Sequence, residues 1–431
     1  MVTARNSNIM EILHSKSIHV CRNKLIESIK QTIYQSSLFY ETVYDLDSLV
    51  DSNRNKRQYL VNLLRDNSKI FIQRGREDVK KLQFESRFES GNLRKAIRVG
   101  LREYELILTP DVNSSTQHQW FYFEVSNMET NYKYTFNIVN CKKINSQFNF
   151  GMKPVIFSVI DALKGRIGWT RSGQDICYYQ NNYCMQGQKK NYFTTSFTIN
   201  FPHSEDICYI AYHYPYTYSQ LMVDINRWAR SINPCEIYLR VDKLCDTLNG
   251  NENPLLTITA PESTKNPINK RKLVFLTARI HPGESNASWI MLGTVEALLS
   301  HSTYASSLRN DYIFKVVPML NIEGVINGCN RYDLTNEDLN RCWKNPSQIQ
   351  HPTIFHTKSL LEYCSFILNR RPFIFIDYHG HSRRKNVFLL GCPNLEILNV
   401  NYCSESSQLQ QNLVIRTCYI PILRYLKNKG L

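Results

Sequence analysis

The chain has 431 residues, 42% hydrophobic and 12% aromatic, with 52 Lys and Arg against 37 Asp and Glu, a formal net charge of +15. This length predicts two domains and an extension. No apolar run reaches the roughly 18 residues that a membrane-spanning helix needs, and the first residues lack the apolar core of a secretory signal. We therefore expect a cytoplasmic protein without a membrane span.

The cysteine spacing and the net charge bear on the class of protein and on its partners. Thirteen cysteines are spread along the chain without a Cys-x-x-Cys pair, which argues against a disulfide framework and a zinc ribbon. The positive charge favours a polyanionic partner, such as nucleic acid, anionic lipid or an acidic polypeptide. No zinc finger, RNA-binding aromatic motif or basic heptad region favours nucleic acid, so we expect no nucleic-acid partner.

The first half of the chain predicts a helical extension and then an antiparallel β-sandwich. Residues 1–80 are polar, with helical patterns at Met10–Ile29 and Tyr59–Leu64. Residues 81–235 contain short aromatic and β-branched segments separated by Gly, Asn, Asp and Pro, which is typical of an all-β domain. The expected strands are Tyr104–Leu108, Trp120–Val125, Tyr132–Val139, Phe193–Phe201 and Cys208–Tyr212, followed by a helix at Tyr218–Ser231.

Residues 236–431 predict an α/β domain. Asn249–Asn269 is rich in Asn, Pro, Thr and Gly and predicts a loop. The apolar segments that follow lack alternation and are interleaved with helical patterns, which indicates a sheet buried on both faces. The expected strands are Lys272–Ile280, Tyr312–Pro318 and Phe373–Asp377, and the expected helices run from the HPGESNAS segment to about Ser300 and over Thr357–Leu368.

Two strand ends carry candidate zinc ligands. His281 and Glu284 lie on either side of Pro282 and Gly283, which supply a turn that lets both side chains face one point. A catalytic zinc needs a third protein ligand and an open position. His379 and His381 follow the strand Phe373–Asp377, and we prefer His379 because it is nearer the strand. We expect His381 to line a pocket or to be structural.

Arginines between these segments suit a peptidase. The planar guanidinium of an arginine can hold a terminal carboxylate, and a second cation can stabilise a developing oxyanion. The candidates are Arg331 and Arg341, the latter in the run Asp338-Leu-Asn340-Arg341. A surface ion pair is the alternative reading of either side chain.

Together these motifs resemble the cytosolic carboxypeptidases, a family of the metallocarboxypeptidase superfamily. The resemblance rests on motifs that occur in order over residues 82–392. In the α/β part they are Arg279-Ile-His281-Pro-Gly-Glu284-Ser-Asn-Ala-Ser288, Asn321…Gly324, Asp338-Leu-Asn340-Arg341 and Asp377-Tyr-His-Gly-His-Ser-Arg-Arg-Lys-Asn-Val-Phe388. In the β part they are Phe84…Leu93, Gln119-Trp-Phe-Tyr-Phe123, Gly151-Met-Lys-Pro154, Gly168-Trp169 and Tyr212…Ser219.

The resemblance implies a metallocarboxypeptidase-like α/β domain with a mixed buried sheet, a preceding β-sandwich and one Zn²⁺ per chain. It implies that His281, Glu284 and His379 bind zinc, that Asn340 and Arg341 hold the substrate's terminal carboxylate, and that Arg331 faces the oxyanion. It further implies removal of C-terminal or branch glutamates from polyglutamylated tubulin or other acidic-tailed proteins, in the cytoplasm and in association with the cytoskeleton or cilium.

The expected general base of this superfamily, a late Glu, is not found. Only Glu396 and Glu405 are acidic among residues 380–431, and neither follows an apolar strand. We therefore expect the last part of the catalytic domain to be missing from this chain. Three alternatives stay open: an inactive truncated form, a basic module that binds acidic tails without cleavage, and the related amidohydrolases that use HxxE with a distant His.

Overall fold

The structure, a computed structural model, describes residues 40–54, 80–114, 117–166, 168–185, 189–381, 384, 386–391 and 415–416. They form two compact units: the first takes its residues from Met1–Thr109 and His118–His213, the second from Pro110–Gln117 and Tyr214–Leu431. The helices predicted at Met10–Ile29 and Tyr59–Leu64 lie outside the described residues. Over the described ranges, no helix has both the length and the apolar character needed to cross a membrane.

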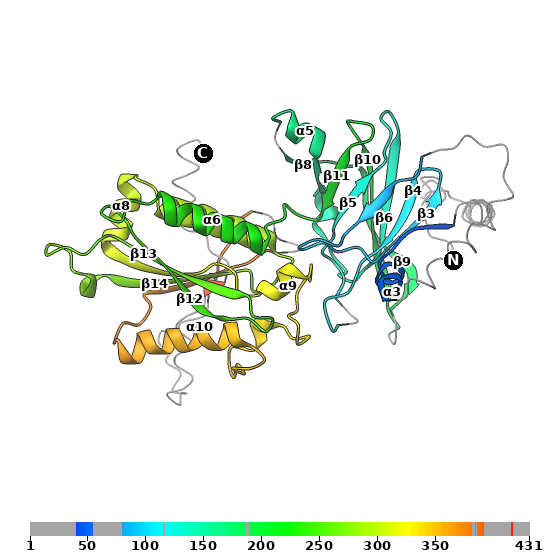
Figure 1. Cartoon of the computed structure of the whole chain (residues 1–431). Helices are drawn as coiled ribbons and strands as arrows, with labels where there is room; N and C mark the ends of the chain where they lie inside the picture. The colour runs from blue at the N-terminus through cyan, green and yellow to red at the C-terminus, as the bar shows by residue number, and fades with distance from the viewer. Residues whose placement is uncertain are drawn as a thin grey trace, which may run out of the picture. The chain divides into compact units, whose positions relative to one another are not determined.

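The first unit is a sandwich of two sheets (Figure 1), with strand orders β1-β3-β4-β6-β10-β9 and β2-β5-β11-β7-β8. The strands are β1 (Glu41–Asp45), β2 (Gln83–Glu85), β3 (Lys95–Gly100), β4 (Glu103–Ile107), β5 (Tyr122–Ser126), β6 (Lys133–Cys141), β7 (Val155–Ser158), β8 (Trp169–Arg171), β9 (Gln174–Cys184), β10 (Asn191–Asn200) and β11 (Ile207–Ala211). The helical segments are α3 (Leu46–Arg54), η1 (Gln147–Phe150) and α5 (Val159–Leu163).

Aromatic side chains fill the space between these two sheets. Phe123 of β5 meets Phe136 of β6 with ring centroids 6.4 Å apart, and Phe84 of β2 meets Tyr104 of β4 edge-on at 5.4 Å. Alternate residues of a strand face the same side, so the inward positions of both sheets share one core. Each aromatic pair adds roughly 0.5–1.5 kcal/mol beyond the burial of its area. The predicted β-sandwich is confirmed.

Two features of this unit correct the sequence-based expectations. Glu41–Asp45 lies in the segment predicted as a helical extension, but it forms β1 and pairs with β3 because Tyr44 is buried in the sandwich core. The sandwich is also not wholly antiparallel, since β4 and β6 pair in parallel. The chain passes from β4 to β5 in the other sheet before it returns to β6, and this crossover allows the parallel direction.

The second unit is built on a seven-stranded mixed sheet of order β12-β13-β15-β14-β16-β18-β17. β14 pairs in parallel with β15 and β16, whereas β12 and β13 are antiparallel. The strands are β12 (Tyr238–Asp246), β13 (Glu252–Thr259), β14 (Lys272–Ala278), β15 (Tyr312–Val317), β16 (Ile374–Tyr378), β17 (Leu390–Gly391) and β18 (Ile415–Arg416). The helical segments are α6 (Tyr218–Ser231), η2 (Ile268–Lys270), α7 (Ser285–Leu298), α8 (Thr303–Asp311), α9 (Ile322–Ile326), η3 (Leu339–Arg341), α10 (Pro352–Glu362) and the π-helical turn η4 (Tyr363–Ile367).

Helices cover both faces of this sheet, with α6 and α10 on opposite sides (Figure 1). On one face, Leu276 of β14 and Val316 of β15 share a core with helices α6 and α7. On the other face, Phe275 of β14 shares a core with Ile354 and Leu361 of α10. Because successive strand residues point to opposite faces, burial on both sides requires continuous apolar strands, as predicted. The predicted mixed, buried sheet is confirmed.

The second unit also corrects two boundaries. The predicted β domain ended at residue 235, but residues 214–235 belong to the second unit because α6 packs Leu221 and Trp228 into its core. The predicted loop Asn249–Asn269 contains strand β13, in which Leu256 and Ile258 are fully buried. Pairing with β12 and β15 overrides the turn-like composition of this segment.

The register of β14 and β16 positions the site. Thr277 pairs with Asp377 and Ala278 with Tyr378, so the two parallel strands end side by side at the same edge of the sheet. His281 follows three residues after β14, and His379 directly follows β16. Ligands of open α/β sheets bind at the carboxyl ends of the strands, and the ends of β14 and β16 are therefore the expected position of a site.

Candidate metal centre

A tight turn after β14 aims His281 and Glu284 at one point. Arg279 enters the turn with a positive φ of 59°, and the amide of Gly283 donates to the carbonyl of Asn330 at 2.9 Å. A Cβ on Gly283 would lie only 2.8 Å from that carbonyl oxygen, so a side chain cannot be accommodated without a shift. Glu284 then occupies the N-cap position of helix α7 without a side-chain capping bond. The Pro-Gly pair thus allows the close approach that directs both side chains.

The buried guanidinium of Arg279 stabilises this turn through hydrogen bonds. It is 1% exposed and donates to the carbonyl oxygens of Pro282 at 2.7 Å and Tyr216 at 3.0 Å, and to the hydroxyl of Ser288 at 2.9 Å. Burial lowers the pKa of Arg279 to about 9, although the negative charge of Glu284 opposes this shift. A buried cation with three acceptors fixes the turn's backbone.

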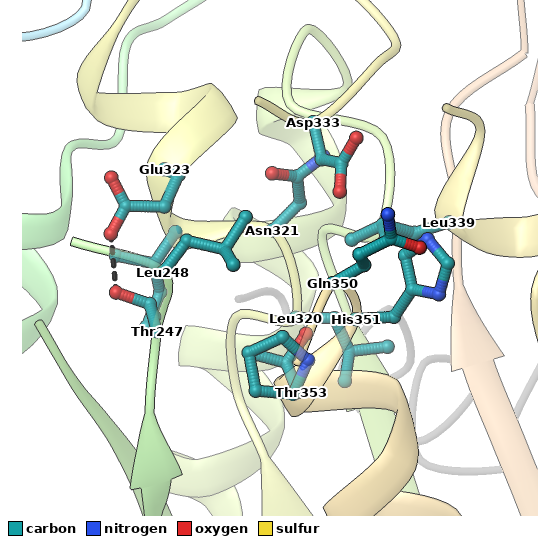
Figure 2. A pocket seen from close by; sticks show the side chains of 12 residues that line it. Thr247, Leu248, Leu320, Asn321, Glu323, Asp333, Leu339, Gln350, His351 and Thr353 are labelled. Atoms are coloured by element: carbon teal, nitrogen blue, oxygen red, sulfur yellow. Dashed lines mark hydrogen bonds between the residues drawn. The ribbon is translucent and has the colours of Figure 1, made fainter. Parts of the chain in front are cut away.

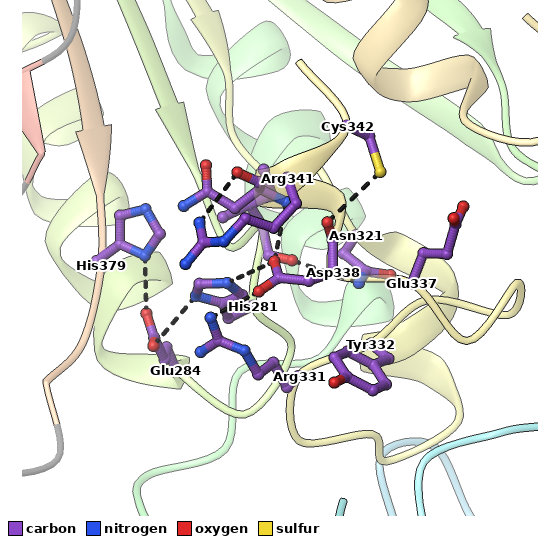
Figure 3. Close-up of polar contacts among 12 residues, drawn as sticks. His281, Glu284, Asn321, Arg331, Tyr332, Glu337, Asp338, Arg341, Cys342 and His379 are labelled. Atoms are coloured by element: carbon purple, nitrogen blue, oxygen red, sulfur yellow. Dashed lines mark hydrogen bonds and ion pairs between the residues drawn. The ribbon is translucent and has the colours of Figure 1, made fainter. Parts of the chain in front are cut away.

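His281, Glu284 and His379 converge at the edge of the sheet (Figure 3). Their candidate ligand atoms all lie within 4.8 Å of one another. The Nδ1 atoms of His281 and His379 lie 3.3 Å and 3.1 Å from the two carboxylate oxygens of Glu284. The ring centroids of the two histidines are 5.0 Å apart. The structure therefore brings together the three residues proposed as ligands from the sequence.

Two aspartates hold the other ring nitrogen of each histidine. Nε2 of His281 contacts Oδ1 of Asp338 at 3.0 Å, and Nε2 of His379 contacts Oδ2 of Asp377 at 2.6 Å. Asp377 is itself fixed by the hydroxyl of Thr277 at 2.9 Å. A carboxylate that accepts from Nε2–H leaves the lone pair of Nδ1 for a metal and raises its basicity. Both histidines are thus oriented to present Nδ1.

The electrostatics of this cluster suit a divalent cation. Burial opposes the charged form of His379, but the carboxylates of Asp377 and Glu284 outweigh it and raise the pKa of His379 to about 10. Burial likewise opposes the charge of Glu284, yet the interactions with His281 and His379 hold its pKa well below the usual range. The buried Nδ1 of His281 makes no hydrogen bond. Two imidazoles and a carboxylate, with this orphaned atom, fit zinc.

Loss of either outer aspartate is expected to weaken metal binding. In Asp338→Asn and Asp377→Asn the histidine loses its carboxylate partner, so we expect a roughly 10–100-fold lower zinc affinity, measured by competition with a chelating dye. Asp224→Asn is the control, because this buried carboxylate pairs with Tyr216 and Arg227 and makes no contact with either histidine. Unchanged affinity in both aspartate variants would contradict the assigned role.

The proposed substrate residues lie on the segment beside His281. Arg331 pairs with Oδ2 of Asp338 at 2.6 Å, so the same carboxylate contacts both Arg331 and His281. Asn340 is buried, and its Oδ1 accepts from Trp343 at 3.1 Å. Arg341 is exposed and donates to the carbonyl of Asn340 at 3.2 Å. In Figure 3 the guanidinium groups of Arg331 and Arg341 both point toward His281. The chain therefore offers cations next to the candidate metal.

Other predicted residues lie apart from the cluster or outside the described residues. His381 is exposed, and its Nδ1 accepts from the amide of Arg384 at 3.0 Å. Arg383 and Lys385, named in the basic run after the histidines, and the acidic residues Glu396 and Glu405 all lie outside the described residues.

A second group of metal-ligand types is explained by local structure. Glu337, Cys342 and His351 lie near one another, and His351 also lines a small pocket (Figure 2) with Glu323. Nδ1 of His351 accepts from the amide of Ser347 at 3.2 Å, so Nε2 carries the proton and donates to Glu337. His351 therefore has a protein partner on each ring nitrogen, and we assign the group a structural role.

The carboxylate of Glu323, which lines the pocket in Figure 2, also has its hydrogen-bond donors within the protein. The carboxylate of Glu323 accepts from the hydroxyl of Thr247 (Figure 2). It also accepts from the side-chain amides of Asn249 and Asn251, at 2.8 Å each. These donors lie in the turn between β12 and β13, so Glu323 of α9 anchors that hairpin. The pocket therefore has a structural carboxylate and not one aimed at a ligand.

Comparisons with known proteins agree with this geometry. A family model described as the cytosolic carboxypeptidase N-terminal domain matches residues 84–213, and one described as zinc carboxypeptidase matches residues 225–386. Cytosolic carboxypeptidase 1 of Homo sapiens is 50% identical over 384 residues, covering 86% of this chain and 29% of that protein. The chain belongs to the cytosolic carboxypeptidase family.

A second cytosolic carboxypeptidase and a solved structure are also similar to this chain. Cytosolic carboxypeptidase 1 of Gallus gallus is 49% identical over 399 residues, covering 89% of this chain and 31% of that protein. A solved metallo-carboxypeptidase from Burkholderia cenocepacia matches with a TM-score of 0.57 at 22% identity, over 72% of this chain and 73% of that one, which shows the fold alone. The chain spans about a third of the length of the curated relatives it matches.

Proposed function

We propose that the chain is a zinc-dependent metallocarboxypeptidase that removes C-terminal or branch glutamates from acidic-tailed proteins such as polyglutamylated tubulin. The observation that carries the proposal is the convergence of His281, Glu284 and His379, each histidine held by its own aspartate. Zinc in this position would lower the pKa of a bound water and polarise the scissile carbonyl. The names of the relatives support a cytosolic location.

The neighbouring residues have roles that fit a carboxypeptidase. Arg341 and Asn340 would bind the terminal carboxylate, because an exposed guanidinium can form two parallel hydrogen bonds with it. Arg331, held by Asp338 next to His281, would donate to the oxygen on which negative charge develops. The net charge of +15 suits an acidic polypeptide and speeds its association.

The test is release of free glutamate from a polyglutamylated tubulin tail by the zinc-loaded chain. Glu284→Ala should abolish release because it removes a metal ligand. Glu296→Gln is the control, since this exposed residue of the same helix pairs with Arg227. Release that is equal in all three proteins would show that the glutamate comes from a contaminant and would reject the proposal.

The second candidate is binding of acidic tails without cleavage. It is favoured because the carboxylates described around the cluster already have partners. Glu284 pairs with both histidines. Asp338 pairs with His281 and Arg331, and Asp377 pairs with His379. Within the described residues, none of these three is left to act as a general base. Zinc binding and tail binding without glutamate release would select this candidate over the first.

A further inference from the structure

The segment Pro110–Gln117 lies between β4 and β5 of the sandwich in sequence but belongs to the second unit in space. Its Asp111 is 1% exposed. The carboxylate accepts three successive backbone amides, from Asn330 at 2.6 Å, Arg331 at 2.8 Å and Tyr332 at 2.8 Å. Successive amides that point to one place form an anion-binding concavity, and here the anion is a side chain of the protein itself.

Further contacts join this segment to the chain around Arg331. The amide of Val112 donates to Sγ of Cys329 at 3.5 Å, and the side chain of Asn113 donates to the carbonyl of Leu334 at 2.8 Å. Gln117 donates to the hydroxyl of Tyr332 at 3.2 Å. The contacts span residues 329–334, so the segment fixes this whole stretch of backbone.

The backbone that Asp111 fixes leads directly to the candidate metal centre. The carbonyl of Asn330 accepts from the amide of Gly283, in the turn between His281 and Glu284. The side chain of Arg331 pairs with Asp338, which holds Nε2 of His281. One buried carboxylate thus constrains the turn that carries two proposed ligands and the arginine proposed for the oxyanion.

We propose that Asp111 is a positioning residue of the active centre, which acts by fixing the backbone of residues 330–332 so that Arg331 is correctly aimed. The proposal rests on the proposed function, because it assigns to Arg331 a role in catalysis. A charged acceptor for backbone amides is worth more than a neutral one, and a misplacement of about 1 Å at a catalytic group can cost roughly 100-fold in rate.

Asp111→Asn is the test, because the amide matches the carboxylate in shape but turns an NH₂ group toward one or more of the three backbone donors. We expect kcat for glutamate release to fall about 10–100-fold, with KM changed by less than about 3-fold, since the interaction lost acts on the transition state. Zinc stoichiometry should stay at the wild-type value. Amide hydrogen exchange of residues 329–334 should become faster.

Asp206→Asn is the matched control. Asp206 is also 1% exposed, and its carboxylate accepts the backbone amides of Ile160 and Ile207 in the first unit. This variant should lose a comparable amount of stability and keep its kcat. A double-mutant cycle with Arg331→Ala adds a second criterion: Asp111→Asn should cost little further rate once the arginine is gone.

The outcomes separate this proposal from the proposed function. An unchanged kcat in Asp111→Asn, or a full additional loss in the Arg331→Ala background, would overturn the positioning role. A wild-type chain without activity would remove the proposed function and the catalytic role of Asp111 together, whereas the exchange measurement would still show whether Asp111 orders residues 330–332. If Asp111→Asn does not fold, Asn113→Gly is the second variant, because it removes the hydrogen bond to the carbonyl of Leu334. Asn113 has a φ of 57°, which glycine tolerates. We expect kcat to fall in this variant as well.

Discussion

Replacing His379 by alanine is expected to abolish stoichiometric zinc binding and, with it, glutamate release. His379 is one of three candidate ligands whose donor atoms lie within 4.8 Å of one another, and its Nδ1 faces Glu284. Two protein ligands hold zinc much less tightly than three, so the loss should exceed the roughly 100-fold that removal of an outer carboxylate can cost. Elemental analysis of the purified, dialysed variant measures the metal content directly.

His381→Ala is the matched control for this prediction. The residue lies two positions further along the chain, is exposed and accepts from the amide of Arg384. We expect this variant to retain wild-type zinc content. A result in which His381→Ala loses zinc and His379→Ala keeps it would reverse the ligand assignment and show that the segment after β16 rearranges when metal binds.

Replacing Arg279 by methionine is expected to destabilise the chain by about 3–5 kcal/mol, because each buried acceptor left without a donor costs roughly 1–3 kcal/mol, and to weaken zinc binding as well. The guanidinium is almost fully buried, and its removal leaves the carbonyl oxygens of Pro282 and Tyr216 and the hydroxyl of Ser288 without their donor. Because Pro282 lies between His281 and Glu284, the turn that carries both candidate ligands should loosen. Denaturant unfolding measures the stability, and chelator competition measures the zinc affinity.

Arg271→Met separates the two effects. Arg271 is also buried and donates to several acceptors, including the carbonyl oxygens of Pro261 at 2.9 Å and Asn266 at 2.8 Å. It precedes the first residue of β14, whereas Arg279 follows the last one, so the two arginines lie at opposite ends of the strand. We expect Arg271→Met to lower stability and to leave zinc affinity unchanged. Equal zinc affinity in both variants would show that Arg279 supports the fold alone.

Much of the fold could be predicted from local sequence patterns. Apolar strands without alternation predicted a sheet buried on both faces, and the helix predicted at Tyr218–Ser231 has the bounds of α6. Patterns failed where strand pairing and burial outweigh the local composition. The segment around β13 has a loop-like composition, and β1 lies in a polar region, yet both are strands because neighbouring strands and a shared core accept their apolar side chains.

The sequence by itself determined the candidate ligands, because imidazole and carboxylate side chains at the ends of two apolar strands are chemically restricted to a few roles. It also indicated Arg331, Asn340 and Arg341 through their motifs. Asp377 could also have been predicted as the partner of His379. It lies two residues before His379, and residues two apart in an extended segment point to the same side.

Only the tertiary structure decided how these groups are held. The partnership of Asp338 with His281, the burial of Arg279 beneath its turn and the capture of three amides by Asp111 each join residues that no local pattern connects. Hydrogen bonds depend on atoms that approach within about 3 Å, and sequence spacing cannot give that distance when the chain passes through other strands in between. The candidate metal ligands are therefore visible in the sequence, whereas the residues that orient them become visible only after the chain has folded.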